Sequence, residues 1–429
     1  MITSSAFRGK RYAVLGLARS GRATVDALLA SGAEVVAWDS NEAARDALAS
    51  NSALSFADPL ETDLTGFAGV VVSPGVPLNR HPIAAHGAKF GVPVIGDIEL
   101  FAEARAELPP HRVVGITGTN GKSTTTALVH HILANAGVPT TMGGNIGLPI
   151  LGQEPLPSGG VYVLELSSYQ IDLTFSLDCD VAVLLNVTPD HLDRYGSMRL
   201  YALSKERLIG MQDVGHAAVI GTDDEWGEKT AREFEWRSSD ITKIKKGSDL
   251  DQSRFLTLQG PHNAQNIKAA ISICKALGVD AAAIESGLRT YPGLPHRMER
   301  LREINGVLYV NDSKATNATS TAPALAAYPS ILWILGGQAK FDDLDDCAPF
   351  FDHVKSAFTI GRDGPMLANL LRPHMPVDES ATLDVALARA SSAARPGDTV
   401  LLSPACASFD QFKDFEARGD AFRALVEAS

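Results

Sequence analysis

A short glycine-rich segment gives the strongest indication of chemistry in this sequence. It reads Gly118-Thr119-Asn120-Gly121-Lys122-Ser123-Thr124, and it lies between the apolar pair Val113-Val114 and an apolar, helix-like pattern. A strand, a glycine turn and a helix start bring backbone N–H groups together around a phosphate. Lys122 then reaches the outer phosphates, and the hydroxyl of Ser123 faces a magnesium ion. The glycines are closer together than in the common pattern, but the flanks still indicate a nucleoside triphosphate site.

A second nucleotide-type pattern opens the chain. Residues 10–16 form an apolar strand that continues into Gly16-Leu17-Ala18-Arg19-Ser20-Gly21, and a later strand ends at Asp39. This is a βαβ pattern with a loosened dinucleotide fingerprint, because Ala18 replaces the middle glycine. NAD, a nucleotide diphosphate and a plain packing turn all stay open at this point. A third strand, residues 70–72, ends in the rigid loop 73–77 at the same sheet edge.

Further polar residues follow predicted strands in the middle of the chain. Strand 161–164 ends at Glu165, and strand 181–185 leads to His191 between Asp190 and Asp193. A carboxylate at the carboxyl end of a parallel strand, beside a phosphate loop, suits a magnesium ligand. His191 is expected to do metal or phosphate work. Lys205, on a helix predicted over 197–209, indicates nothing by itself.

Length and composition set the remaining limits. The 429 residues suffice for about three domains, and we expect an α/β protein with three domains. These are an N-terminal Rossmann-like sheet (1–103), a central P-loop-type ATPase sheet (104–292) and a C-terminal Rossmann-like domain (293–429). Residues 221–255 are expected to be irregular. The net charge of −12 and the lack of a basic stripe argue against nucleic-acid binding.

Other expectations concern where the protein works. Four cysteines without CxxC spacing indicate neither a disulfide framework nor a zinc site. We therefore expect a cytoplasmic protein. No apolar run approaches the ~20 residues of a membrane span, so membrane insertion is not expected. We expect a monomer.

Together these segments resemble the Mur ligase family over almost the whole chain. The likeness rests on the phosphate loop, Gly144-Asn145-Ile146-Gly147, Glu165-Leu166-Ser167-Ser168, residues 186–194, 262–266, 296–297, 311–317 and 403–415. The block at 403–415 is similar to the branch that adds D-glutamate to UDP-N-acetylmuramoyl-L-alanine. The resemblance implies an ATP-dependent amide ligase that forms an acyl phosphate before the amine of D-glutamate displaces phosphate.

The resemblance also implies a site assignment, residue by residue. The catalytic residues would be Lys122, Glu165, His191 and Lys205. Two magnesium ions would be held by Ser123, Glu165, His191 and Lys205, the last of these as a carbamate. ATP would be bound by Gly118, Thr119, Asn120, Gly121, Lys122, Ser123, Thr124, Asn263, Asn266, Arg297 and Asp312. The UDP-sugar would be bound by Leu17, Ala18, Arg19, Ser20, Asp39, Ser73, Gly75 and Asn145, and adenine would lie near Asn145, Asn263 and Asn266. D-Glutamate would be bound by Lys314, Thr316, Lys340, Ser408 and Phe415.

Two alternatives are kept. One is another ligase of the superfamily, which adds a different amino acid, including L-glutamate, or acts as a folylpolyglutamate synthase. The other is a non-catalytic nucleotide-binding or dehydrogenase-like protein with the same fold. The joint presence of Lys122, Glu165, His191 and Lys205 disfavours the second alternative.

Overall fold

The computed structural model describes residues 1–49, 51, 53–235, 240–247, 250–340 and 342–428. It contains three sheets built mainly of parallel strands, which confirms the predicted α/β class. The chain divides into two compact units: the first comprises residues 1–245 and 265–287, and the second comprises residues 246–264 and 288–429. Each sheet falls inside one predicted domain, and the domain boundaries themselves stay a prediction.

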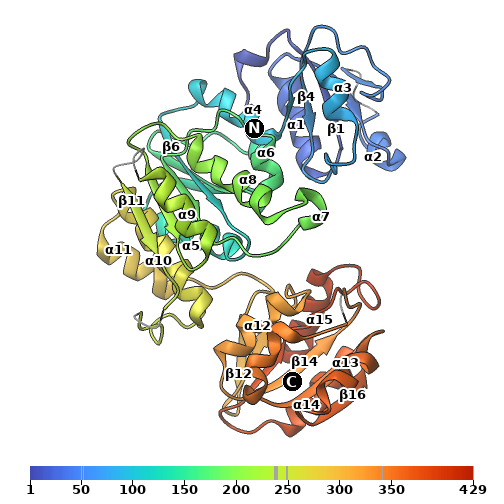
Figure 1. Ribbon diagram of the computed structural model, residues 1–429, viewed down its shortest axis with the longest axis vertical. Coiled ribbons are helices and arrows are strands. Elements are labelled where there is room, and N and C mark those ends of the chain that lie inside the picture. The colour runs from blue at the N-terminus through green and yellow to red at the C-terminus, as the bar shows by residue number, and fades with distance from the viewer. Residues whose placement is uncertain (50, 52, 236–239, 248–249, 341, 429) are drawn as a thin grey trace. The chain divides into compact units, whose positions relative to one another are not determined.

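The first unit begins with a wholly parallel sheet of order β3-β2-β1-β4-β5 in the described residues. Its elements are β1 (Arg11–Leu15), β2 (Glu34–Trp38), β3 (Leu54–Phe56), β4 (Phe67–Val72), β5 (Val94–Ile95), α1 (Arg19–Ala30), α2 (Glu42–Asp46), α3 (Ile83–Lys89), α4 (Asp97–Ala104) and the short 3-10 helices η1 (Ser5–Phe7) and η2 (Arg105–Glu107) (Figure 1). The strand order reverses at β1. A crevice therefore opens at the carboxyl ends of β1 and β4.

The second sheet of this unit is also parallel, with order β11-β10-β9-β6-β8-β7. Its elements are β6 (His111–Thr117), β7 (Thr140–Gly144), β8 (Gly160–Glu165), β9 (Val181–Leu184), β10 (Ala217–Gly221), β11 (Ile241–Ile244), α5 (Lys122–Asn135), η3 (Ile150–Gly152), α6 (Ser168–Asp172), α7 (Leu192–Tyr195), α8 (Met198–Gly210), α9 (Glu225–Phe234), α10 (Pro261–Ala276) and α11 (Ala281–Thr290). β6 lies between β8 and β9, so the phosphate loop emerges where the strand order reverses.

Helix α4 joins the two sheets of the first unit. The Glu99 carboxylate accepts hydrogen bonds from the N–H of Phe175 (2.6 Å) and from the N–H (3.0 Å) and hydroxyl (2.7 Å) of Ser176. The N–H of Gly96 donates to the carbonyl of Leu173 over 2.9 Å. A charged acceptor with several donors gives strong hydrogen bonds, which explains why both sheets belong to one unit.

The prediction that residues 221–255 are irregular is wrong for α9 and β11, which lie in this range. Asp224 caps α9 by accepting from the N–H groups of Trp226 (3.1 Å) and Gly227 (2.9 Å). Strand β11 pairs in parallel with β10. It is an edge strand with exposed side chains, so its sequence lacks the apolar run of a buried strand. Residues 236–239 and 248–249 lie outside the described residues.

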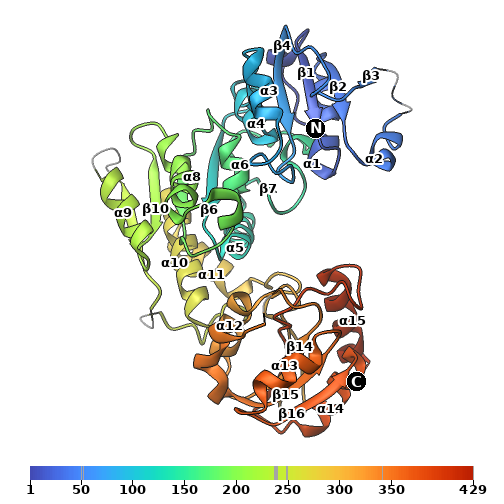
Figure 2. The same ribbon diagram turned by 45° about the vertical axis from the view of Figure 1, so that its right-hand side comes forward.

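The second unit holds a sheet of order β12-β13-β17-β14-β15-β16, in which β12 alone of the described strands is antiparallel. Its elements are β12 (Glu299–Ile304), β13 (Val307–Asn311), β14 (Ile331–Gly336), β15 (Val354–Ile360), β16 (Val377–Ala381), β17 (Thr399–Leu402), α12 (Ala318–Ala327), η4 (Asp345–His353), α13 (Gly364–Leu371), α14 (Leu383–Ala393) and α15 (Phe415–Glu427) (Figure 2). Every residue of β14 is buried, because apolar clusters cover both faces of this sheet.

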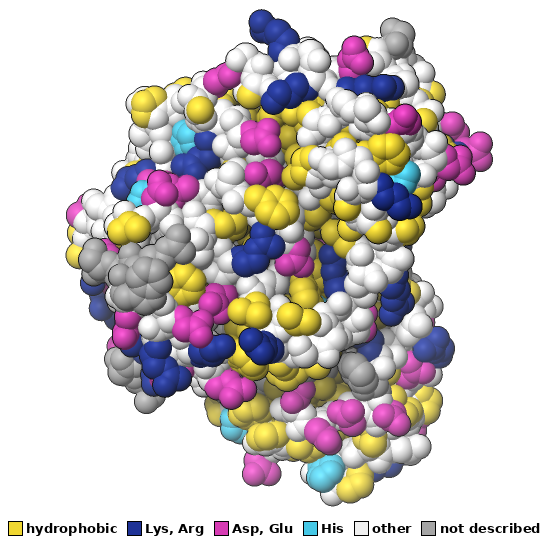
Figure 3. Space-filling view, turned by 45° about the horizontal axis from the view of Figure 1, so that its top comes forward, with side chains coloured by type: hydrophobic (Ala, Val, Ile, Leu, Met, Phe, Trp, Pro, Cys, Tyr) yellow, Lys and Arg dark blue, Asp and Glu magenta, His cyan; other side chains and the backbone are white. Residues whose placement is uncertain are grey.

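The surface agrees with the composition. Acidic and basic side chains are interspersed on the face seen in Figure 3, without a continuous basic stripe on that face. None of the helices in the described part of the chain combines the length and apolar composition of a membrane span.

Candidate active site

The phosphate loop connects β6 to α5 through two glycines with positive φ. Gly121 has φ +84°, and a Cβ placed there would lie 2.4 Å from Oδ1 of Asn266. That same Oδ1 accepts a hydrogen bond from the hydroxyl of Thr125 over 3.2 Å. The predicted ATP residue Asn266 therefore lies buried against the loop, where its amide packs on Gly121.

Asn186, which the site prediction did not include, braces the loop from the end of β9. Its Oδ1 accepts from the N–H of Asn120 (2.9 Å), and its Nδ2 donates to the carbonyl of Asn120 (3.1 Å). The carbonyl of Asn186 accepts from the N–H of Thr119 over 2.9 Å. A strand-end asparagine beside the strand that carries a phosphate loop was the available signal.

Lys122 begins α5 and folds back over the loop. Its Nζ donates to the carbonyls of Gly118 and Thr119, both at 2.9 Å. Ser123 follows in the first turn and is buried. The first turn of a helix presents backbone N–H groups and a partial positive charge, so the loop, the helix end and Lys122 together favour an anion.

Glu165 ends β8 beside the phosphate-loop strand, in register with Ile116. Its side chain is buried, and Oε1 accepts from Nδ2 of Asn145 over 2.9 Å. Oε2 is buried without a hydrogen-bond partner among the described residues, as is the hydroxyl of Thr117. A buried carboxylate oxygen without a donor is costly unless a cation meets it. The residues present therefore fit a magnesium ion.

Lys205 on α8 is only 1% exposed, and its Nζ donates to the carbonyl of Gly118 over 2.9 Å. The ammonium also lies 4.6 Å from the ring centroid of Tyr201. Burial, reinforced by the neighbouring charge of Lys122, lowers the pKa of Lys205 well below its ordinary value, although Asp190 and Asp172 oppose the shift. The helix and the phosphate loop thus meet through one lysine.

His191 lies just before α7 with φ 53°. Its Nε2 is 3.4 Å from a carboxylate oxygen of Asp190. Burial lowers its pKa, and Asp190 acts in the opposite direction. Its ring packs on Tyr169 with centroids 5.0 Å apart and on Tyr201 at 6.2 Å. No cluster of three or more His, Cys, Asp or Glu side chains suited to a metal occurs among the described residues.

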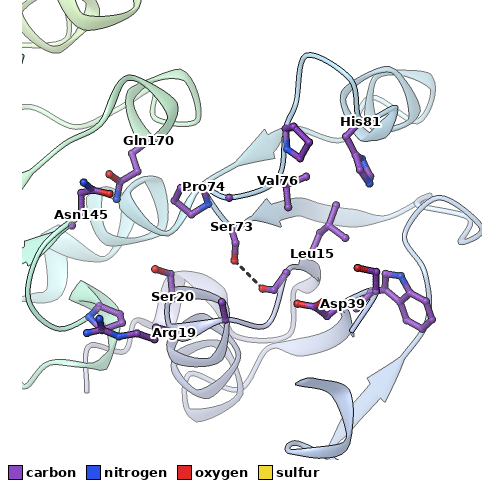
Figure 4. Close-up of a pocket in the computed structure, with 18 of the residues that line it drawn as sticks. Leu15, Arg19, Ser20, Asp39, Ser73, Pro74, Val76, His81, Asn145 and Gln170 are labelled. Atoms are coloured by element: carbon purple, nitrogen blue, oxygen red, sulfur yellow. Dashed lines mark hydrogen bonds between the residues drawn. The ribbon is translucent and has the colours of Figure 1, made fainter. Parts of the chain in front are cut away.

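The predicted UDP-sugar residues gather around a cavity of about 670 Å³ at the crevice of the first sheet. Ala18, Arg19, Ser20, Asp39, Ser73, Gly75 and Asn145 all line it, together with Trp38, His81 and Gln170. In Figure 4, Arg19 and Ser20 lie below Ser73, Asn145 and Gln170 lie to the left, and Asp39 lies to the right. The hydroxyl of Ser73 donates to the carbonyl of Gly16 over 2.8 Å.

A hydrogen bond between Leu17 and Asp39 fixes the loop that forms one wall of this cavity. The side chain of Leu17 is buried in the core, whereas its N–H donates to Oδ2 of Asp39 over 2.7 Å. Oδ1 of Asp39 accepts from the N–H of Asn41 over 2.9 Å. Each carboxylate oxygen keeps a second lone pair, so Asp39 can hold the loop and still accept from a ribose hydroxyl.

In the second unit, Lys314 and Phe415 of the predicted amino-acid set are together. The ammonium of Lys314 lies 3.8 Å from the ring centroid of Phe415. Ser408 is buried, and its carbonyl accepts from the N–H of Phe412 over 2.8 Å. Thr316 follows β13, and Lys340 follows β14. The described contacts do not join these two residues to the others.

The predicted ATP residues of this unit are more deeply placed. Asp312 is buried, and it accepts from the hydroxyl of Ser403 (2.8 Å) and the N–H of Met298 (3.1 Å). Burial raises the pKa of Asp312 to about 7, and the charge of Arg297 opposes this. Asn263 lies in the first turn of α10, which belongs to the second unit up to residue 264, and its Nδ2 donates to the carbonyl of Gln259 over 3.0 Å.

Arg418, also absent from the site prediction, holds these strand ends together. It is 1% exposed and donates to the carbonyls of Ser313 (2.9 Å), Cys406 (3.0 Å) and Gly336 (3.3 Å). Ser313 follows β13, Cys406 follows β17, and Gly336 is the last residue of β14. Burial lowers the pKa of Arg418 to about 10. The contacts of this arginine could not be predicted from the sequence, because its partners are distant in the chain.

Comparison with known proteins explains this combination of loops. Residues 10–96 match the MurD-like N-terminal domain of Mur ligases, residues 116–274 match the Mur ligase middle domain, and residues 296–406 match the Mur ligase glutamate ligase domain. A relative from Novosphingobium aromaticivorans is 63% identical over 100% of this chain and 97% of its own. The chain belongs to the Mur ligase family.

The Novosphingobium relative and one from Sphingopyxis alaskensis, 60% identical over 100% of this chain and 99% of its own, are both named UDP-N-acetylmuramoylalanine–D-glutamate ligase. Among solved Mur ligase structures, MurF from Thermotoga maritima in complex with ADP has a TM-score of 0.60 at 16% identity, covering 98% of this chain and 96% of its own. MurC from the same organism has a TM-score of 0.59 at 18% identity, covering 98% and 99%. These structures support the fold of the present Mur ligase.

Proposed function

We propose that this Mur ligase uses ATP to join D-glutamate to the L-alanine carboxylate of UDP-N-acetylmuramoyl-L-alanine. The observation that carries the proposal is the 63% identity, over the whole chain, to a relative of that name. The site geometry supports it independently. A phosphate loop and a nucleotide-sized cavity lie in the first unit, and a lysine beside an aromatic ring lies in the second.

The first chemical step is the activation of a carboxylate. A carboxylate oxygen of the acceptor attacks the γ-phosphorus of ATP, the bond to the β-phosphate oxygen breaks, and ADP leaves. Lys122 and the N-terminus of α5 bind the phosphates and screen the repulsion between two anions. Lys122 is suited to this because carbonyls of the loop already hold its ammonium at the helix start.

Magnesium supplies charge neutralisation at the transferring phosphate when it is bound. Ser123 and Glu165 would hold one ion and His191 a second, with the phosphates completing the ligand sets. The free oxygen of Glu165 supports the first assignment. Lys205 is proposed to react as a neutral amine with carbon dioxide, so that a nitrogen–carbon bond forms, the nitrogen releases a proton, and a carbamate anion results. Its burial and its contact with the phosphate loop support that proposal.

The second step forms the amide. The amine of D-glutamate attacks the acyl carbon, the bond to the phosphate oxygen breaks, and phosphate leaves while the nitrogen loses a proton. Two lysines, Lys314 and Lys340, match the two carboxylates of glutamate in charge. Thr316, Ser408 and Phe415 would orient and pack the amino acid, and Arg297, Asp312 and Asn263 would contact ATP.

A ligation assay tests the proposal. Purified protein is given ATP, magnesium and UDP-N-acetylmuramoyl-L-alanine together with D-glutamate, L-glutamate or L-lysine, and the UDP-linked product is resolved by chromatography. We expect product and ADP with D-glutamate. If product forms with L-lysine or with L-glutamate but not with D-glutamate, the protein is a different ligase of the superfamily. No ADP release in any arm would indicate the non-catalytic alternative.

A further inference from the structure

Two segments of the first unit that serve different substrates touch each other. One is the substrate loop, residues 73–81, several residues of which line the cavity of the first sheet. The other is the His191 segment, residues 190–195, which follows β9 of the second sheet. Nδ2 of Asn79 donates to the carbonyl of Asp193 over 3.3 Å, and Nη1 of Arg194 donates to the carbonyl of Val76 over 3.5 Å.

Arg194 continues this connection toward the phosphate side. Its guanidinium carbon lies 3.7 Å from the ring centroid of Tyr169. Stacking of a cation on an aromatic face at this distance is attractive and fixes the relative position of the two side chains. The Tyr169 ring in turn packs on the His191 ring, with centroids 5.0 Å apart.

His191 depends on such contacts for its orientation. Its ring is half-exposed, and its described polar contact is an ion pair with the adjacent, equally exposed Asp190. Exposed pairs of this kind contribute little to positioning. The ring contacts with Tyr169 and Tyr201 therefore carry most of the orientation.

We propose that Arg194 is a positioning residue that transmits occupancy of the UDP-sugar cavity, through Val76 on one side and Tyr169 on the other, to His191. Val76 and Gln170, the neighbour of Tyr169 in the chain, both line that cavity and are labelled in Figure 4. A UDP-sugar that orders the substrate loop thus orders His191 as well. The inference rests on the proposed function for the roles of the cavity and of His191.

The chain offers a matched control. Arg207 on α8 also stacks on an aromatic ring, with its guanidinium carbon 5.3 Å from the centroid of Phe175, and donates to a backbone carbonyl, that of Thr174, over 2.8 Å. Both arginines are half-buried. Arg207 has no described contact with the substrate loop or His191, so its loss removes a similar stacked cation without breaking the proposed connection.

The test measures linkage between the two nucleotides. The dissociation constant of a non-hydrolysable ATP analogue with magnesium is determined by calorimetry, with and without UDP-N-acetylmuramoyl-L-alanine. We expect the UDP-sugar to tighten analogue binding at least fivefold in the wild type and in Arg207→Ala. The tightening should vanish in Arg194→Ala and become smaller in Asn79→Ala, a substitution at an exposed position that folding tolerates. The dissociation constant of the UDP-sugar itself should stay within about threefold of the wild-type value in Arg194→Ala, because Arg194 does not line the cavity.

Steady-state ligation provides the second readout. Arg194→Ala should lower kcat about 10- to 100-fold with a much smaller change in the KM for UDP-sugar, as expected for a misplaced group. Arg194→Lys, which keeps the charge without the planar face, should recover only part of the rate. Undiminished linkage in Arg194→Ala, an equal loss in Arg207→Ala, or no linkage in the wild type would overturn the inference. Failure of the proposed function is separate, since it appears as absent ligation in the wild type.

Discussion

Replacement of Asp97 by asparagine tests how the base of the UDP-sugar crevice is built. Asp97 opens α4, is 4% exposed, and lies with Ser20, Thr24 and Ser73 around a packing gap too small to hold a water molecule. Its Oδ1 accepts from the N–H of Ile98 over 3.1 Å, while Oδ2 is buried without a hydrogen-bond partner in the described residues. Burial raises the pKa of Asp97 from 3.8 to about 6.

The raised pKa fixes the sign of the effect on stability. The folded protein holds this proton more tightly than the unfolded chain, so the favourable contribution is complete below pH 3.8 and is lost as the pH rises through about 6. A shift of about two units corresponds to about 3 kcal/mol above that range. Asparagine keeps the acceptor for Ile98 and never ionises. Asp97→Asn should therefore stabilise the first unit at neutral pH by up to about 3 kcal/mol.

Hydrogen exchange measured on peptides from 94–104 reports this difference locally. At pH 7.5 the variant should be protected up to about 100-fold more than the wild type, and at pH 5 the ratio should be roughly ten times smaller, following the titration of the wild-type carboxyl. Asp26→Asn, at an exposed position on α1, serves as the control. A variant-to-wild-type ratio that does not change between these pH values would refute the idea of an ionised, buried carboxylate.

Three other substitutions test separate contacts. Gly121→Ala forces a Cβ onto Asn266 at a left-handed φ, so it should cost about 1–3 kcal/mol and weaken ATP-analogue binding at least tenfold, as measured by calorimetry. Lys122→Ala should lower kcat by about 100- to 1,000-fold in the ligation assay while the UDP-sugar still binds. Arg418→Leu leaves buried carbonyls without donors, so it should destabilise the second unit by about 3 kcal/mol, seen as faster exchange of β14 amides. Wild-type values in these measurements would contradict the corresponding assignment.

Much of the fold follows from short-range patterns. Most predicted strands are confirmed within a residue or two, and a helix follows the phosphate loop as predicted, although β4 begins three residues before the predicted strand 70–72. Buried parallel strands read as apolar runs, and glycine turns mark their ends. The prediction failed at 221–255, where the strand is an edge and the helix is mostly polar. Apolar residues are few in this helix and exposed positions interrupt this strand, so neither element shows the apolar run by which the other strands were predicted.

The site was harder to predict because its contacts join distant residues. Sequence spacing brings Glu165 and His191 to one sheet edge, and the structure places both at strand or helix ends there. The sequence could not show that Oε2 of Glu165 has no hydrogen-bond partner among the described residues. Nor could it show that Arg418 donates to carbonyls at three strand ends. Those facts depend on which donors and acceptors remain after the sheets have packed.

The carbonyl of Gly118 connects the two lysines of the first unit. It accepts from Nζ of Lys122 and from Nζ of Lys205, each at 2.9 Å. Burial lowers the pKa of Lys205, and the repulsion between two ammonium groups on one oxygen lowers it further, so Lys205 loses its proton readily. Bound phosphates would attract the ammonium of Lys122 away from the Gly118 carbonyl and leave Lys205 as the remaining lysine donor to it. The electrostatic environment of Lys205 therefore depends on the same loop that is proposed to bind the nucleotide, although the two lysines are 83 positions apart in the sequence.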